Sequence, residues 1–146
     1  MTHTPVPWAT ALRLTLGGGL AFWVTNVAIS LTPIAAAYRA AFSISYWPMT
    51  VAALIGGLFI AGCVSGLLLT VRDCMPGVSP ILTAMLLSLG MLVVIEAFSI
   101  AVDVGRLSIF HVIGAAINVL RFLALGVAVG WLAGRPEARV VPSARR

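Results

Sequence analysis

The sequence predicts an all-α integral membrane protein, with four transmembrane helices in an up-down-up-down antiparallel bundle and both termini in the cytoplasm. Three observations support this prediction. The chain of 146 residues is 61% hydrophobic and only 9% charged, whereas about 25% of residues are charged in a soluble domain. Its apolar residues gather into four long blocks separated by short links. Its arginines concentrate at one set of predicted helix ends, which the positive-inside rule assigns to the cytoplasm.

Each apolar block has the length of a membrane span. The blocks cover residues 9–32, 48–71, 79–102 and 109–133. About 24 residues make a helix of about 36 Å, which is enough for a hydrocarbon core of about 30 Å. Helices are expected because an open strand would leave its backbone groups unpaired in lipid. The prediction is one transmembrane domain over residues 1–134, followed by a short basic cytoplasmic tail over residues 135–146.

The first block has a signal peptide as its alternative, because Ala35, Ala36 and Ala37 resemble a small-residue cleavage site. The apolar stretch is longer than the roughly 7 to 15 residues of a signal peptide, which favours a span. The segment 35–47 that follows is either an interfacial half-turn or a short amphipathic helix. In the helical form, Tyr38 and Phe42 would face lipid and Arg39 would face headgroups.

Short links and arginine positions give the topology. The links 73–77 and 103–106 contain turn-forming residues, and connections this short favour antiparallel neighbours. An even number of spans places six of the arginines on one side, and Arg39 and Arg106 on the other. The six are Arg13, Arg72, Arg135, Arg139, Arg145 and Arg146. We expect the cytoplasm on their side. All nine basic residues are arginine, as in GC-rich genomes, so we expect a prokaryotic plasma membrane.

Composition and motifs argue against several functions. The net charge of +5 does not indicate nucleic-acid binding, because most arginines are single residues near helix ends or in the tail. The sequence contains no CxxC pair, HExxH helix, phosphate-binding glycine loop or serine elbow. His3 and His111 belong to opposite predicted ends, so they would not share a metal, and Cys63 and Cys74 would not pair. We therefore expect a non-enzyme without cofactor or metal, whose partner is the lipid bilayer.

Two glycine stripes predict close helix contacts. Gly62 and Gly66 have GxxxG spacing in the second span, and Gly126, Gly130 and Gly134 extend the same spacing in the fourth. Glycine surfaces let helix backbones approach in lipid, where no hydrophobic force joins helices. The stripes serve either contacts within one bundle or association with other chains. In the second case, the fourth span would join a homo-oligomer or a larger membrane complex.

Two charged residues, Glu96 and Arg121, lie inside predicted spans. Insertion scales assign a charge at the centre of a span a cost of roughly 2.5 to 3.5 kcal/mol. By helix rise, Glu96 lies about 9 Å below the outer edge and Arg121 about 18 Å below it. We expect an intramembrane polar cluster that consists of Asn26, Glu96, Ser99, Asn118 and Arg121. It would open outward to a vestibule formed by Asp103, Arg106 and His111.

This cluster leaves two functions open. In the first, it fixes helix packing in a structural, accessory or assembly subunit, with Glu96 neutralising Arg121. In the second, the protein is an oligomeric transporter of a small solute, an ion or protons that uses both charges, since intramembrane ionisable residues often mark such pathways. An enzyme that acts on lipid has no nucleophile, base or metal site to support it.

Overall fold

The structure, a computed structural model, describes residues 8–72, 77–102 and 109–135. Within these ranges the chain is all-helical, and its five helices are α1 (Trp8–Ser30), α2 (Pro33–Ala41), α3 (Tyr46–Val71), α4 (Pro80–Val102) and α5 (Ile109–Gly134). All except α2 contain an apolar stretch long enough to cross a membrane. This finding confirms the all-α class and the four membrane-length helices, which indicate a small membrane protein.

The outer surface of the helices is as apolar as their interior. Phe59, Phe98 and Val102 each expose more than two thirds of their surface, at 74%, 71% and 71%. Soluble monomers rarely expose apolar surface of this extent, because its transfer to water is unfavourable. Lipid chains would cover the same side chains without that cost. The exposed surface is therefore consistent with a bilayer around the four long helices.

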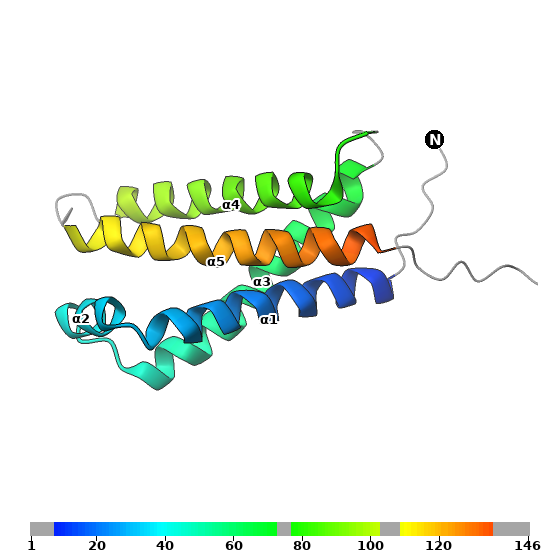
Figure 1. The fold of residues 1–146 in the computed structure, drawn as a ribbon. Helices are drawn as coiled ribbons and strands as arrows, with labels where there is room; N and C mark the ends of the chain where they lie inside the picture. Colours follow the sequence, from blue (N-terminus) through cyan, green and yellow to red (C-terminus); the bar gives the residue numbers. More distant parts are fainter. Residues whose placement is uncertain (1–7, 73–76, 103–108, 136–146) are drawn as a thin grey trace, which may run out of the picture.

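Helix α5 lies between α4 and α1, and α1 lies between α5 and α3 (Figure 1). The extensive contacts join α1 to α3, α4 to α5 and α1 to α5. Helices α3 and α4 follow one another in the chain but contact each other much less. A short link thus brings their ends together without pairing their whole lengths. The core fills the interfaces of α1 and α5, and includes Leu14, Phe22, Val64, Leu68, Phe122, Leu125 and Val129.

Small residues explain why α1 packs closely on two neighbours. A methyl group on Gly18 would lie 2.5 Å from Val129 Cγ2 of α5, and one on Gly19 would lie 3.0 Å from Leu58 Cα of α3. Both glycines are buried. A side chain at either position would separate the helices, so glycine is required for this approach. One turn further along, Phe22 fills the same interface.

The break between α1 and α2 comes from the pair Thr32 and Pro33. A residue that precedes proline is disfavoured in helical conformation, and Thr32 is extended, with φ −79° and ψ 149°. Its hydroxyl accepts a hydrogen bond from the Ala35 amide at 3.3 Å, which caps the first turn of α2. After α2, Ser43 adopts a positive φ of 53° and the chain turns into α3. Of the two alternatives for this region, a short helix is what the structure contains.

Arginines from two other helices meet the C-terminal end of α5. Arg13 Nη2 donates to the Leu132 carbonyl at 3.4 Å, and Arg72 Nη1 donates to the Ala133 carbonyl at 3.3 Å. The last carbonyls of a helix lack partners within the helix, and its dipole favours positive charge there. Helix α5 thus ends in a cluster of positive charge. Helix α2 lies at the opposite end of the bundle (Figure 1).

Candidate functional site

A hydrogen-bonded relay links α4 and α5 through one amide. Asn118 Nδ2 donates to Glu96 Oε1 at 2.7 Å, and Arg121 Nη1 donates to Asn118 Oδ1 at 3.0 Å. The carboxylate accepts, the guanidinium donates, and the amide does both, so each group has the partner its chemistry requires. All three side chains are half-buried. We call Glu96, Asn118 and Arg121 the polar relay.

Glu96 and Arg121 do not form a direct ion pair, although both lie in the described part of the chain. Asn118 separates them because it lies one helical turn before Arg121 and therefore nearer to the depth of Glu96. An amide that donates at one end and accepts at the other connects charges that cannot reach each other. The depths estimated from the helix rise placed these residues near one another. The structure adds that Asn118 bridges the two charges.

The other two residues of the predicted intramembrane cluster lie outside the relay. Asn26 of α1 is fully buried, but neither atom of its side-chain amide has a hydrogen-bond partner among the described residues. Ser99 of α4 is exposed on the outer surface of the helix. Helical spacing placed Ser99 on the face of Glu96, but the structure leaves its side chain exposed.

The predicted outer vestibule is only partly described. Asp103 and Arg106 lie outside the described residues. His111 is half-buried near the start of α5, where its ring meets Phe42 edge to face with centroids 6.1 Å apart. This contact helps to join the end of α2 to α5. In the described part of the chain, no group of three or more His, Cys, Asp and Glu residues could hold a metal ion.

The glycine stripe of α5 is used inside this chain. A methyl group on Gly126 would lie 2.8 Å from Met85 Cα, and one on Gly130 would lie 2.8 Å from the Pro80 carbonyl oxygen. These neighbours belong to the backbone of α4 or to its first residue, and cannot rotate away. Gly134 is looser, with its nearest neighbour, Pro80 Cγ, at 3.9 Å. Helix α4 therefore packs on the glycine stripe for which association with a second chain was the alternative prediction.

The glycine stripe of α3 is less closely packed. Gly62 faces Thr15 of α1 at the ordinary distance of 3.7 Å. A methyl group on Gly66 would meet nothing within 4 Å, and this residue is exposed. The closest glycine contacts of α1 instead involve the glycine run Gly17, Gly18 and Gly19. That run in the middle of a span was the available sequence signal for this interface.

A polar cavity of about 200 Å³ lies where α2 packs on α5. Its polar lining comes from three helices and consists of Ser30, Tyr38, Arg39, Asn118 and Arg121. Arg39 Nη1 donates to the carbonyl of Ser30, the last residue of α1, at 2.9 Å. Its guanidinium also lies 5.5 Å from the centroid of the Tyr46 ring. These two contacts hold Arg39 at the wall of the cavity.

Tyr38 differs from its predicted orientation. Tyr38 was expected to face lipid, yet it is half-buried, lines the cavity and lies against Gly114 of α5. A methyl group on Gly114 would lie 3.1 Å from the tyrosine Oη. The expectation was wrong because an isolated helical face does not reveal that α5 offers a glycine opposite. Ser30, Tyr38 and Arg39 are the site residues that sequence reasoning missed.

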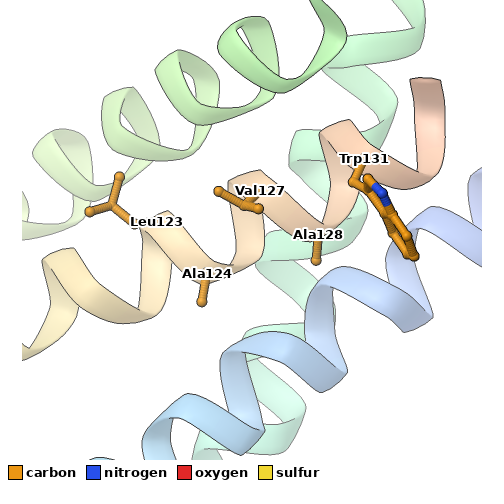
Figure 2. Close-up of a pocket in the computed structure, with 5 residues that line it drawn as sticks. All are labelled: Leu123, Ala124, Val127, Ala128 and Trp131. Atoms are coloured by element: carbon orange, nitrogen blue, oxygen red, sulfur yellow. The ribbon is translucent and has the colours of Figure 1, made fainter.

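A second hollow is an apolar groove on α5. Figure 2 shows its lining of Leu123, Ala124, Val127, Ala128 and Trp131 along that helix. The two alanines form a low surface, and the lining is almost entirely apolar. It contains no titratable or nucleophilic side chain. In a bilayer it would accept lipid chains, so the polar chemistry of the described chain lies in the relay and the cavity.

The fold and the relay define a small helical membrane protein with an intramembrane hydrogen-bond network. The chain matches no known protein-family model, and neither a curated protein nor a solved structure is significantly similar to it.

Proposed function

We propose that the protein is a non-catalytic structural or accessory subunit of the membrane, in which the polar relay fixes the packing of α4 on α5. The observation that carries this proposal is the position of Asn118, which donates to Glu96 at 2.7 Å and accepts from Arg121 at 3.0 Å. A polar group in lipid that lacks a partner is costly. Only one rotation and depth of α4 against α5 satisfies all three side chains, so the relay selects that register.

The relay acts together with the glycine contacts of the same interface. Gly126 and Gly130 bring the helix backbones close, and this close approach holds Asn118 within reach of Glu96. Small residues and interhelical hydrogen bonds are the usual means of helix association in lipid. The α4 and α5 pair therefore has two sources of specificity along one interface.

For the orientation, we propose that the chain runs up-down-up-down with both termini in the cytoplasm of a prokaryotic cell. Arg13, Arg72 and Arg135 support this proposal, since they gather around the end of α5. Basic residues are enriched on the cytoplasmic side. If the protein forms a homo-oligomer or joins a larger complex, the contact would use a surface other than Gly126 and Gly130, which α4 covers.

A double-mutant cycle tests the relay. We expect Glu96→Gln and Arg121→Met each to lower the free energy of unfolding in mixed micelles by about 0.6 to 1.7 kcal/mol. The double variant should lose less than the sum, because each change already leaves the other charge without its compensation. Ser99→Ala is the control and should change nothing, since Ser99 is exposed. Undiminished stability in every variant would exclude the structural role.

Transport is the second candidate, supported by the fact that Arg121 and Asn118 also line a polar cavity. In this case, purified protein in liposomes should give a proton or ion flux that Glu96→Gln abolishes. Four helices seldom enclose a pathway, so we would expect the active form to be an oligomer. Silence across a panel of solutes, with protein that is folded in the same liposomes, would rule strongly against transport.

A further inference from the structure

We propose that the cavity between α2 and α5 binds a phosphate group, with Arg39 and Arg121 as its ligands. This inference goes beyond the structural role, because it assigns a ligand class to a cavity that shares Asn118 and Arg121 with the relay and adds Arg39. The two guanidinium groups come from different helices and line one cavity of about 200 Å³. Their convergence in apolar surroundings is the first argument for an anion.

The charge around the cavity favours an anion. Glu96 is the one acidic residue in the described ranges, and it is not among the residues that line the cavity. Its carboxylate lies beyond Asn118, from which Oε1 accepts a hydrogen bond. Two positive charges therefore face the cavity, while a single negative charge lies behind the relay. Because like charges in a medium of low dielectric repel strongly, an anion between them would lower the energy.

The unused donors of Arg121 also favour an anion. A guanidinium carries five N–H donors. Arg121 donates from Nη1 to Asn118, and no other hydrogen bond joins its guanidinium to a described residue, so the group has donors left for a ligand. The acceptor oxygens of a carboxylate lie in one plane, whereas those of a phosphate group point to the corners of a tetrahedron, and each pair of them suits the planar fork of an arginine. Two forks from separate helices therefore match a phosphate group better than a carboxylate.

The size and position of the cavity limit which phosphate-bearing molecules it could bind. Pockets for drug-sized ligands measure about 300 to 1,000 Å³, so a cavity of about 200 Å³ fits a headgroup or a small ion. Trp47, which is 74% exposed, stands at the start of α3, close in sequence to the cavity residues Ile44 and Met49. Exposed tryptophans mark the membrane interface, where lipid headgroups lie. A phospholipid headgroup and free phosphate share the required chemistry.

Binding can be measured on the full-length protein in micelles of an uncharged detergent with three probes. The first probe is inorganic phosphate, compared with chloride at equal ionic strength. The second is phosphatidylglycerol, and the third is diacylglycerol, which has the acyl chains without the phosphate. Native mass spectrometry counts bound lipid, and thermal unfolding reports stabilisation, since a ligand that binds the native state raises the Tm. We expect phosphatidylglycerol, inorganic phosphate or both to bind, and diacylglycerol not to bind.

Arg39→Gln supplies the decisive variant, because Arg39 is outside the polar relay. We expect it to weaken binding of the phosphate probe roughly tenfold or more, as hydrogen bonds to charged groups are among the stronger ones. The matched control is Arg13→Gln. Arg13 also donates to a carbonyl at the end of a helix, Leu132 O, and carries the same charge, but it lies at the opposite end of the bundle. Its replacement should leave binding unchanged.

A second variant guards against misfolding. Gly114→Ala adds a methyl group 3.1 Å from the Tyr38 Oη at the cavity wall while both arginines remain, so it should weaken binding in protein whose ligand-free Tm is retained. Binding of phosphatidylglycerol alone would identify a headgroup site, and binding of inorganic phosphate would identify a site for a soluble phosphate. The proposal is overturned if neither probe exceeds diacylglycerol. It is also overturned if Arg39→Gln and Arg13→Gln weaken binding equally.

Discussion

Replacing Asn118 by leucine is expected to lower the free energy of unfolding by roughly 1.5 to 3 kcal/mol, the range of hydrogen bonds that involve charged groups. The change removes the donor to Glu96 and the acceptor for Arg121 together. Both charges then stay half-buried without the amide that joins them. Equilibrium unfolding in mixed micelles measures this loss, with a proximity label on α4 and α5 as the probe of the transition.

The matched control makes the same substitution elsewhere. Asn26→Leu replaces a fully buried asparagine, and the amide of Asn26 has no hydrogen-bond partner among the described residues. Removing an unsatisfied buried polar group is neutral or stabilising when the new side chain fits. We therefore expect the changes in the free energy of unfolding to have opposite signs in the two leucine variants. If both variants lose stability, the loss at Asn118 should be larger by at least the contribution of the relay hydrogen bonds. Equal losses at Asn26 and Asn118 would contradict the assignment of the relay to Asn118.

Gly130→Ala is expected to destabilise the protein by roughly 1 to 3 kcal/mol, the usual cost of overpacking. The new methyl group would lie 2.8 Å from the Pro80 carbonyl oxygen and 2.9 Å from the Ile81 amide nitrogen. Both atoms belong to the backbone of α4, so relief requires the helices to move apart. That movement also lengthens the contact between Asn118 and Glu96. Equilibrium unfolding and crosslinking yield between α4 and α5 should fall together.

Gly90→Ala is the control for this change. Gly90 lies on α4, and a methyl group there would meet nothing within 4 Å. Alanine is favoured over glycine in a helix by up to about 1 kcal/mol, so this variant should be neutral or more stable. Comparable destabilisation at both glycines would show that the loss reflects glycine flexibility. The close contact between helices would then not be its cause.

The four long helices follow from the sequence alone. Residues 9–32 were expected where α1 spans Trp8–Ser30, and residues 48–71 where α3 spans Tyr46–Val71. The agreement is close because the requirement is local. An apolar stretch must be long enough to cross the hydrocarbon and must satisfy its own backbone hydrogen bonds. Neither condition depends on which helix lies alongside.

The proximity of the three relay residues was also predictable, whereas the rotation of the helices was not. The rise per residue placed Glu96, Asn118 and Arg121 within reach of each other, and the relay joins all three. The face that each helix turns to its neighbours depends on packing, which helical spacing does not reveal. Ser99 was therefore expected beside Glu96 but is exposed. Tyr38 was expected in lipid but lines the cavity.

By itself, the sequence determined the number of membrane-length helices, their approximate limits and the presence of costly polar groups within them. Only the tertiary structure decided that α5 lies between α1 and α4, that Asn118 bridges two charges and that Arg39 joins Arg121 at one cavity. The physical reason is that a helix in lipid makes its backbone hydrogen bonds within its own segment. The partners of a side chain are chosen by the close packing of glycine surfaces contributed by distant parts of the chain.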